Sequence, residues 1–158
     1  MKITIDNLDA TYKLCISTGN IKEKTTDIEL IKSLKILAEK SIEFIDKKSK
    51  DIPEDSTDWT FVFRDYYESL RGLLEAYLLF DGIGAENHQC KNAYACFKHP
   101  ELALDWDFLE TVRLKRNAIN YRGHLLKHED WKYLKLKFAL HINALKKEIK
   151  KKLDDGMQ

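Results

Sequence analysis

The sequence predicts an all-α fold, an antiparallel bundle of four to five helices with a short N-terminal helical arm. The 158 residues include two prolines and six glycines, so few positions interrupt a long helix. Apolar residues recur three and four positions apart along most of the chain, which is the spacing of an amphipathic helix. No segment of useful length alternates with the period of two that a half-buried strand requires, so no strands are predicted.

Composition limits the class of protein. With 44% apolar and 34% charged residues, the chain is globular, and its length suits one domain with an ordinary hydrophobic core. The net charge is +1, so the overall basic excess of a non-specific nucleic-acid binder is absent. Any contact with RNA or a nucleotide must therefore come from a local site.

The three cysteines, Cys15, Cys90 and Cys96, are an odd number without CxxC spacing. This pattern predicts reduced thiols in a cytoplasmic protein. Together with His88 and His99, Cys90 and Cys96 give a spacing that matches no standard zinc site. We therefore predict neither a metal nor a cofactor.

Targeting signals are not expected at the N-terminus. Residues Met1 to Asp9 lack the basic start and apolar core of a signal peptide. The longest apolar run is too short for a membrane span, which predicts a protein without membrane contact.

The first 25 residues are predicted to form the arm. Apolar residues at helical spacing between Leu8 and Ile16 indicate a short helix over 6–17 that ends before Gly19. The bundle is predicted to span 26–153. Its first helix has Thr26 as the N-cap and runs to about Lys48. One side of this helix carries an apolar row formed by Ile28, Ile31, Leu34, Leu37, Ile42 and Ile45.

The next helix is predicted to be the central one. Asp58 caps it, and it runs from Trp59 to about Asp81, where Gly82 and Gly84 follow. Two apolar stripes cover most of its circumference, which is typical of a helix surrounded by others. Gly72 in its interior costs about 1 kcal/mol relative to alanine, and we expect a close helix contact to offset that cost. The stripes are Trp59, Val62, Tyr66, Leu70, Leu73 and Tyr77, and Phe63, Tyr67, Leu74 and Leu78.

Three more helices complete the predicted bundle. One covers 88–98 and stops before Pro100. Another covers 105–121 and is closed by Gly123, and the last covers 129–153. Residues 154–158 are predicted to be a disordered tail.

Arginine is concentrated in one short stretch. The chain has 22 lysines and five arginines, and three of the five lie between positions 113 and 122. The planar guanidinium binds phosphate, carboxylate and stacked bases in ways that lysine does not. A helical projection places a polar ribbon beside the apolar face of Leu109, Val112 and Ile119. The ribbon consists of Arg116, Asn120, Arg113, Asn117 and Tyr121.

Arginines and amides at the border of a core are costly unless they are paired or used. The ribbon therefore has two interpretations. Either it binds an anionic ligand, or Arg116 is a structural arginine bonded to carbonyls or to an acid such as Glu75.

The stretch from Arg113 to His124 resembles the signature helix of HEPN domains, in which an arginine, a polar residue, a short spacer and a histidine follow one another. Arg116-Asn117 matches the first half of that motif. The central helix is similar to its HEPN counterpart, and the resemblance covers about 26–150. The matching residues are Arg64-Asp65-Tyr66-Tyr67, Leu70-Arg71-Gly72-Leu73-Leu74-Glu75-Ala76, Gly82-Ile83-Gly84 and His88.

The sequence departs from the family at one position. Tyr121 stands where the resemblance places the catalytic histidine, and His124 follows after a longer spacer. In the family mechanism the histidine activates a ribose 2′-hydroxyl and the arginine steadies the phosphate. A tyrosine is a poor base at neutral pH but can donate a hydrogen bond or stack on a base. The resemblance makes Arg116, Asn117 and Tyr121 the candidate catalytic residues. The candidate ligand-binding residues are Arg113, Asn120, Arg122, His124 and Tyr67.

The resemblance implies a protein that binds RNA or a nucleotide, as a toxin-like or accessory partner of a minimal nucleotidyltransferase in a toxin–antitoxin pair. It also implies a homodimer whose signature helices face each other, with two copies of Arg116 at one cleft. Two alternatives stay open. One is a metal-independent endoribonuclease in which Tyr121 or His124 replaces the usual histidine, and the other is a purely structural helical partner.

Overall fold

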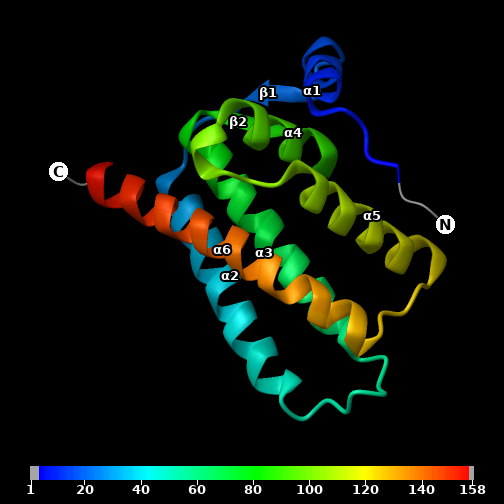
Figure 1. Ribbon diagram of the computed structural model, residues 1–158. Coiled ribbons are helices and arrows are strands. Elements are labelled where there is room, and N and C mark those ends of the chain that lie inside the picture. The colour runs from blue at the N-terminus through cyan, green and yellow to red at the C-terminus, as the bar shows by residue number, and fades with distance from the viewer. Residues whose placement is uncertain (1–3, 157–158) are drawn as a thin grey trace.

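The computed structural model describes residues 4–156 and is mostly helical (Figure 1), as predicted. The elements of this part of the chain are α1 (Leu8–Ser17), β1 (Ile21–Glu23), α2 (Ile28–Ser49), α3 (Trp59–Phe80), β2 (Ile83–Ala85), α4 (His88–Lys98), the 3-10 helix η1 (Pro100–Leu102), α5 (Trp106–Arg122) and α6 (His128–Gly156). Helices α2 to α6 make up the bundle, and α1 packs outside it against α4.

Helix α3 is the centre of the bundle. Most of its residues are buried, including Phe63 and Leu73, which have no exposed surface. Helix α2 packs along one side of α3, α6 packs along another, and α4 and α5 contact the remaining surface (Figure 1). Phe138 of α6 meets Phe63 edge to face with 5.7 Å between ring centroids, a preferred aromatic geometry. The apolar circumference read from the sequence is therefore confirmed.

Several helix ends differ from the prediction. Asp27 rather than Thr26 is the N-cap of α2, and its side chain accepts a hydrogen bond from the Leu30 amide. Thr26 instead donates its hydroxyl to the Leu79 carbonyl, 2.8 Å away. Asp58 holds the N-cap position of α3 without a capping side-chain bond.

The end of the chain also differs. Helix α6 runs to Gly156, so residues 154–156 are helical and not part of a disordered tail. Residues 157 and 158 of the predicted tail, and the first three residues of the arm, lie outside the described residues.

The prediction of no strands was wrong. β1 and β2 form a short antiparallel pair with Ile21 opposite Ala85 and Glu23 opposite Ile83. Three residues are too few to show an alternating pattern, so periodicity could not reveal them. Gly82 precedes β2 with a φ of 67°, a backbone conformation that favours glycine. The pair joins the arm to the end of α3.

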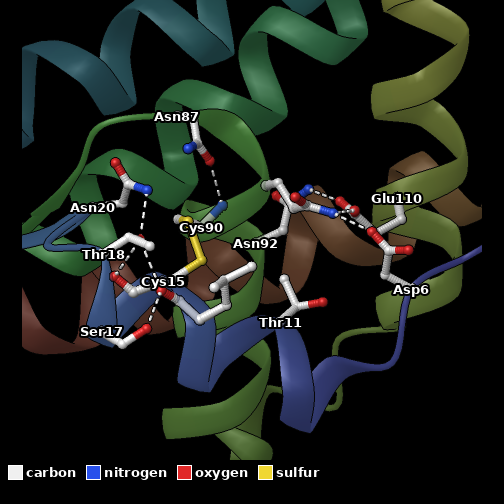
Figure 2. The surroundings of a disulfide bond; sticks show 12 residues. Asp6, Thr11, Cys15, Ser17, Thr18, Asn20, Asn87, Cys90, Asn92 and Glu110 are labelled. Atoms are coloured by element: carbon white, nitrogen blue, oxygen red, sulfur yellow. Dashed lines mark hydrogen bonds between the residues drawn. A yellow bond between two sulfur atoms is a disulfide. The ribbon is translucent and has the colours of Figure 1, made fainter.

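The prediction of three reduced thiols was wrong for two of them. Cys15 of α1 and Cys90 of α4 form a disulfide (Figure 2). The two residues are 75 positions apart, and spacing along the chain cannot show that the fold brings them together. Cys96 is free and half-buried, and burial raises the pKa of its thiol to about 12. The disulfide fastens the arm to α4.

Across residues 4–156, none of the helices is both long enough and apolar enough to traverse a lipid bilayer. In the same residues, no group of three or more histidine, cysteine or acidic side chains is arranged to hold a metal ion.

Candidate functional site

An open pocket of about 340 Å³ lies between the first turn of α4 and the middle of α5. Four of the residues singled out in the sequence line it. The lining consists of Arg113, Arg116, Asn117 and Tyr121 from α5, and of Glu86, Asn87, His88 and Gln89 from the start of α4. The pocket is therefore lined by part of the predicted ribbon and by a segment 24 or more positions earlier in the chain.

Local helix signals position both sides of the pocket. Asn87 caps α4, because its side-chain oxygen accepts a 2.8 Å hydrogen bond from the Cys90 amide. This cap fixes the direction in which the first turn of α4 leaves the β2 strand. On α5, Arg113, Arg116 and Asn117 are three and four positions apart and so share one face.

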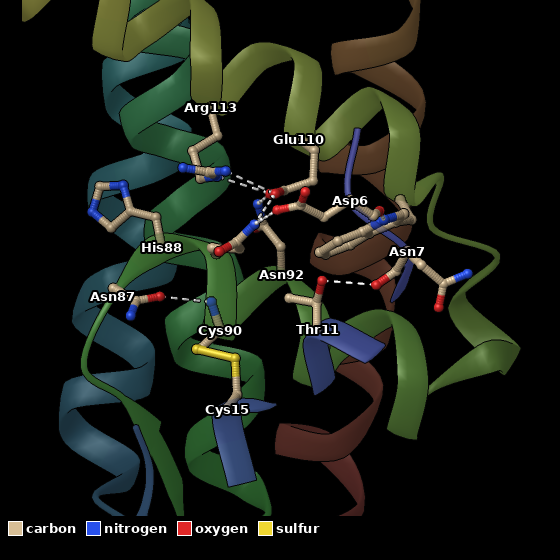
Figure 3. Close-up of polar contacts among 12 residues, drawn as sticks. Asp6, Asn7, Thr11, Cys15, Asn87, His88, Cys90, Asn92, Glu110 and Arg113 are labelled. Carbon is tan, nitrogen blue, oxygen red and sulfur yellow. Dashed lines mark hydrogen bonds and ion pairs between the residues drawn. A yellow bond between two sulfur atoms is a disulfide. The ribbon is translucent and has the colours of Figure 1, made fainter. Parts of the chain in front are cut away.

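Arg113 is engaged by a buried carboxylate. Its guanidinium donates two hydrogen bonds of 2.9 Å to the oxygens of Glu110, which is 1% exposed (Figure 3). Gln89 and Asn92 of α4 donate to the same carboxylate at 2.9 and 3.0 Å. Four charge-assisted or amide hydrogen bonds saturate Glu110. This network holds α4 against α5 and leaves Arg113 little freedom to contact a ligand.

The arm reaches the same network. Gln89 also donates to the side chain of Asp6 at 3.1 Å. The Trp106 indole donates to the Asp6 backbone carbonyl at 2.8 Å. Figure 3 shows Asp6 beside Glu110, with the Cys15–Cys90 disulfide on the other side of Asn92. The arm therefore buttresses the first turn of α4.

Arg116 is held loosely. Its side chain is 22% exposed, and a terminal nitrogen lies 3.6 Å from Glu68 of α3, beyond hydrogen-bond distance. The other oxygen of Glu68 accepts two bonds from Arg71, at 3.0 and 2.8 Å. The Arg116 Nε is buried and finds no hydrogen-bond partner among residues 4–156. Its guanidinium carbon lies 5.9 Å from the centre of the Tyr67 ring.

The structural alternative named in the sequence is met in part, because Arg116 forms an ion pair with an acid, Glu68, at 3.6 Å. Glu75, the acid suggested as its partner, lies 3.8 Å from Lys91 instead. Lys91 is buried, and burial lowers the pKa of its ammonium. The cluster between α3, α4 and α5 thus places four cations, Arg71, Lys91, Arg113 and Arg116, against the three carboxylates of Glu68, Glu75 and Glu110.

His88 is the histidine that the fold places at this pocket. Its Nδ1 lies 2.9 Å from the Tyr67 hydroxyl. Burial, followed by the charges of Arg71, Lys91 and Arg116, lowers the pKa of His88 to about 4. Burial likewise raises the pKa of Tyr67 to about 12. At neutral pH the site therefore contains an uncharged imidazole and an uncharged phenol.

Sequence reasoning gave His88 no site role, because it comes from a helix that does not carry the arginines. One signal was available, since His88 belongs to the segments that resemble the family. The other residues missed at the site are Glu86, Asn87 and Gln89 in the lining, and Glu68, Arg71, Lys91 and Glu110 around it.

The remaining predicted site residues do not enter the pocket. Asn120, Arg122 and His124 are exposed, and the pocket lining does not include them. Tyr121 stands at the rim with 78% of its surface exposed. Tyr67 lies behind the pocket, where its ring faces Arg116 and its hydroxyl meets His88. The predicted site residues after Tyr67 therefore fall into two groups: Arg113, Arg116 and Asn117 are half-buried, and those from Asn120 onward are exposed.

No protein-family model, no curated protein and no solved structure matches the chain.

Proposed function

We propose that this chain is a HEPN-type protein that binds RNA or a nucleotide, with Arg116 receiving a phosphate group. The observation that carries this proposal is the state of the Arg116 guanidinium. It lines an open pocket, its closest carboxylate is 3.6 Å away, and its buried Nε has no partner among the described residues. A phosphate oxygen would satisfy such a group with short, charge-assisted hydrogen bonds.

The rest of the pocket suits a nucleic-acid fragment. Asn87 and Asn117 carry amides, which can donate to phosphate or to a base edge, whereas the Gln89 amide already donates to Asp6 and Glu110. Tyr121 at the rim offers an exposed aromatic face for stacking on an unpaired base. Two cations, Arg113 and Arg116, line the pocket beside one carboxylate, Glu86, which pairs with Lys22 at 2.7 Å, so the lining favours an anion although the whole chain is nearly neutral.

Metal-independent RNA cleavage is the second candidate, and the position of His88 favours it. When Nδ1–H donates to Tyr67, the lone pair of Nε2 is free to accept a proton. In that reaction the 2′-hydroxyl proton passes to Nε2, the 2′-oxygen bonds to phosphorus, and the bond to the 5′-oxygen breaks. The leaving 5′-oxygen takes that proton from Nε2, which returns the imidazole to its neutral form, and Arg116 steadies the charge on the phosphate oxygens. His88 then has the role that the sequence assigned to Tyr121 or His124.

The partners follow from the resemblance alone. They are a minimal nucleotidyltransferase, for which this chain is a toxin-like or accessory partner, and a second copy of the chain. A cytoplasmic location also belongs to this proposal, but the Cys15–Cys90 disulfide is typical of proteins from oxidising compartments. Trapping thiols with a mass-shifting alkylating agent in intact cells would show whether that bond forms where the protein works.

Fluorescence anisotropy with a 5′-labelled single-stranded RNA tests the binding site. We expect Arg116→Ala to weaken binding at least tenfold, whereas Arg64→Ala, an exposed arginine on the outer part of α3, leaves it unchanged. An equal loss of affinity in both variants would mean that the RNA is bound by non-specific charge attraction and not at the pocket. No binding by the wild-type chain at low salt would remove the proposal.

Incubation of the RNA with the protein in EDTA tests the second candidate. Cleavage that disappears in both His88→Gln and Arg116→Ala supports an endoribonuclease. Intact RNA at high protein concentration, with binding retained, leaves a binding protein. If Arg116→Ala keeps both binding and cleavage but is less stable than the wild type, the purely structural alternative is favoured.

A further inference from the structure

Another hollow, of about 180 Å³, lies between α2 and α3, which pack along each other (Figure 1). It shares no lining residue with the pocket between α4 and α5. Small residues line much of it, namely Ala38 and Ser41 of α2 and Ser69 and Gly72 of α3. The close helix contact expected at Gly72 is absent, since a Cβ there would meet no atom within 4 Å. The two helices therefore leave space for a ligand at this point.

Ser69 presents an unpaired hydroxyl to this hollow. The residue is 4% exposed, and its Oγ has no hydrogen-bond partner among residues 4–156. Buried hydroxyls are normally paired. Because Ser69 lines the hollow, a polar group placed there supplies the missing partner.

Asp65 lies beside this hydroxyl. It precedes Ser69 by four positions, so both side chains lie on one face of α3. Burial raises the pKa of the Asp65 carboxyl, which means that its charge is poorly solvated. Ser41 of α2 lines the hollow together with Asp65 and also lines the neighbouring hollow beside Phe44 with it. Two helices thus bring a carboxylate and two hydroxyls to one place.

The cations around Asp65 are engaged by other groups. Arg71, which also lines the hollow, donates hydrogen bonds of 3.0 and 2.8 Å to Glu68. The two lysines of the neighbouring hollow both approach Glu43, at 3.8 and 3.5 Å. Arg64, the residue before Asp65, is exposed and lies over an aromatic ring at 5.9 Å. Within the described residues, Asp65 is therefore a carboxylate with space for a cation beside it.

The chemistry of the lining favours a primary ammonium group on an alkyl chain. An ammonium has three N–H donors and no acceptor, which matches the three acceptors Asp65, Ser41 and Ser69. A guanidinium is a planar fork that suits paired acceptors in one plane. Leu34 and Leu37 line the same hollow, and their apolar surface would be left unused by a bare inorganic cation.

A second carboxylate lies further along the hollow. Glu75 follows Asp65 by ten positions, which is about 15 Å along the helix axis. Its contact with Lys91 is 3.8 Å long, beyond hydrogen-bond distance, so its oxygens can accept from another donor. The hollow is smaller than the roughly 300 Å³ at which drug-sized sites begin. A narrow space with an acid toward each end suits a thin chain with a cation at each end.

We propose that this hollow binds a linear aliphatic polyamine, with one ammonium group held by Asp65 and the two serines and a second at Glu75. The alkyl chain between them lies over the glycine and against the two leucines. The proposal does not depend on what the pocket around Arg116 binds.

Isothermal titration calorimetry of the full chain with spermidine, in the absence of RNA, tests the site. We expect one spermidine per chain. Asp65→Asn should weaken binding about tenfold, because a charged hydrogen bond is lost. Asp51→Asn removes the same charge from an exposed position before α3 and should leave binding unchanged. Ser69→Ala should also weaken binding but should not lower stability, since the hydroxyl that it removes is buried and unpaired.

Gly72→Leu tests the location without changing any charge. Its side chain fills the hollow and should abolish binding, whereas circular dichroism should match the wild type because the position has free space. Spermidine binding that survives Gly72→Leu would show general attraction to acidic groups and overturn the proposal. Equal affinity for spermidine and for N-acetyl-lysine amide would assign the site to a single lysine-type cation and overturn the polyamine. The absence of binding at about 1 mM spermidine would overturn it as well.

Discussion

The Tyr67 hydroxyl lies 2.9 Å from His88 Nδ1, which joins the centre of α3 to the first turn of α4 beside Arg116. The imidazole of His88 is uncharged at neutral pH although it lies within a cluster of cations. Burial and the neighbouring guanidinium groups both disfavour its protonation, and a phenol is a partner that it can keep without a charge. The site therefore contains a neutral imidazole, His88, and a permanently charged guanidinium, Arg116, close to each other.

The pKa of His88 has a consequence for stability. In the unfolded chain a histidine takes up a proton near pH 6.5, whereas folded His88 does so only near pH 4. Neutral His88 therefore costs the folded state nothing above about pH 6.5. As the pH falls from about 6.5 to about 4, the unfolded chain binds a proton that folded His88 does not, so the free energy of unfolding decreases. The groups that face this imidazole are Tyr67, Glu68 and Arg71 from α3, Lys91 from α4 and Arg116 from α5.

We expect His88→Gln to reduce the loss of stability between pH 7 and pH 5, measured by urea unfolding. His124→Gln is the matched control, because His124 is exposed. The same pH dependence in His88→Gln and in the wild type would contradict this assignment.

Arg113 and Arg116 should behave differently when each is replaced by alanine. Arg113→Ala leaves the carboxylate of Glu110 buried without its charged partner, which costs about 3 kcal/mol. Arg116→Ala removes a distant pair that is partly exposed, so its cost should be about 1 kcal/mol or less. Thermal and urea unfolding of the two variants measure the difference. A larger loss for Arg116→Ala would make Arg116 the structural arginine.

The long, strongly patterned elements could be predicted from the sequence. The apolar stripes of α3 and the glycines that follow it place its ends within one residue of Trp59 and Phe80. The concentration of arginine drew attention to Arg113, Arg116 and Arg122, of which the first two line one pocket and Arg122 is exposed outside it. Both inferences depend on residues close together in the chain, where helical spacing determines which side chains are neighbours.

What the sequence could not show depends on distant parts of the chain. The β1–β2 pair joins three-residue segments about 60 positions apart, and no periodicity extends over such short runs. The Cys15–Cys90 bond and the approach of His88 to Arg116 arise from the packing of α4 against α1 and α5. The sequence shows three cysteines and a histidine without an evident role. Tertiary contacts alone determine that Cys15 meets Cys90 and that His88 approaches Arg116.

The disulfide should contribute substantially to stability. A cross-link across 75 positions lowers the entropy of the unfolded chain by an amount worth about 4 kcal/mol. Reduction, or Cys15→Ser with Cys90→Ser, should lower the urea midpoint by a corresponding amount. It should also loosen the first turn of α4, measured as faster amide exchange at Gln89 and Cys90. The double serine variant controls for other effects of the reductant, because adding reductant should not change its urea midpoint. An unchanged midpoint on reduction would show that the arm contributes little to the fold.

Gly72 lowers the stability of α3 without a compensating contact. The sequence predicted a close helix contact at this glycine, but a Cβ built there would meet no atom within 4 Å. Gly72→Ala should therefore raise the free energy of unfolding by about 1 kcal/mol, because α3 gains helix propensity at no steric cost. Urea unfolding of the variant and the wild type measures the difference. A lower free energy of unfolding in Gly72→Ala would show that this position needs the glycine.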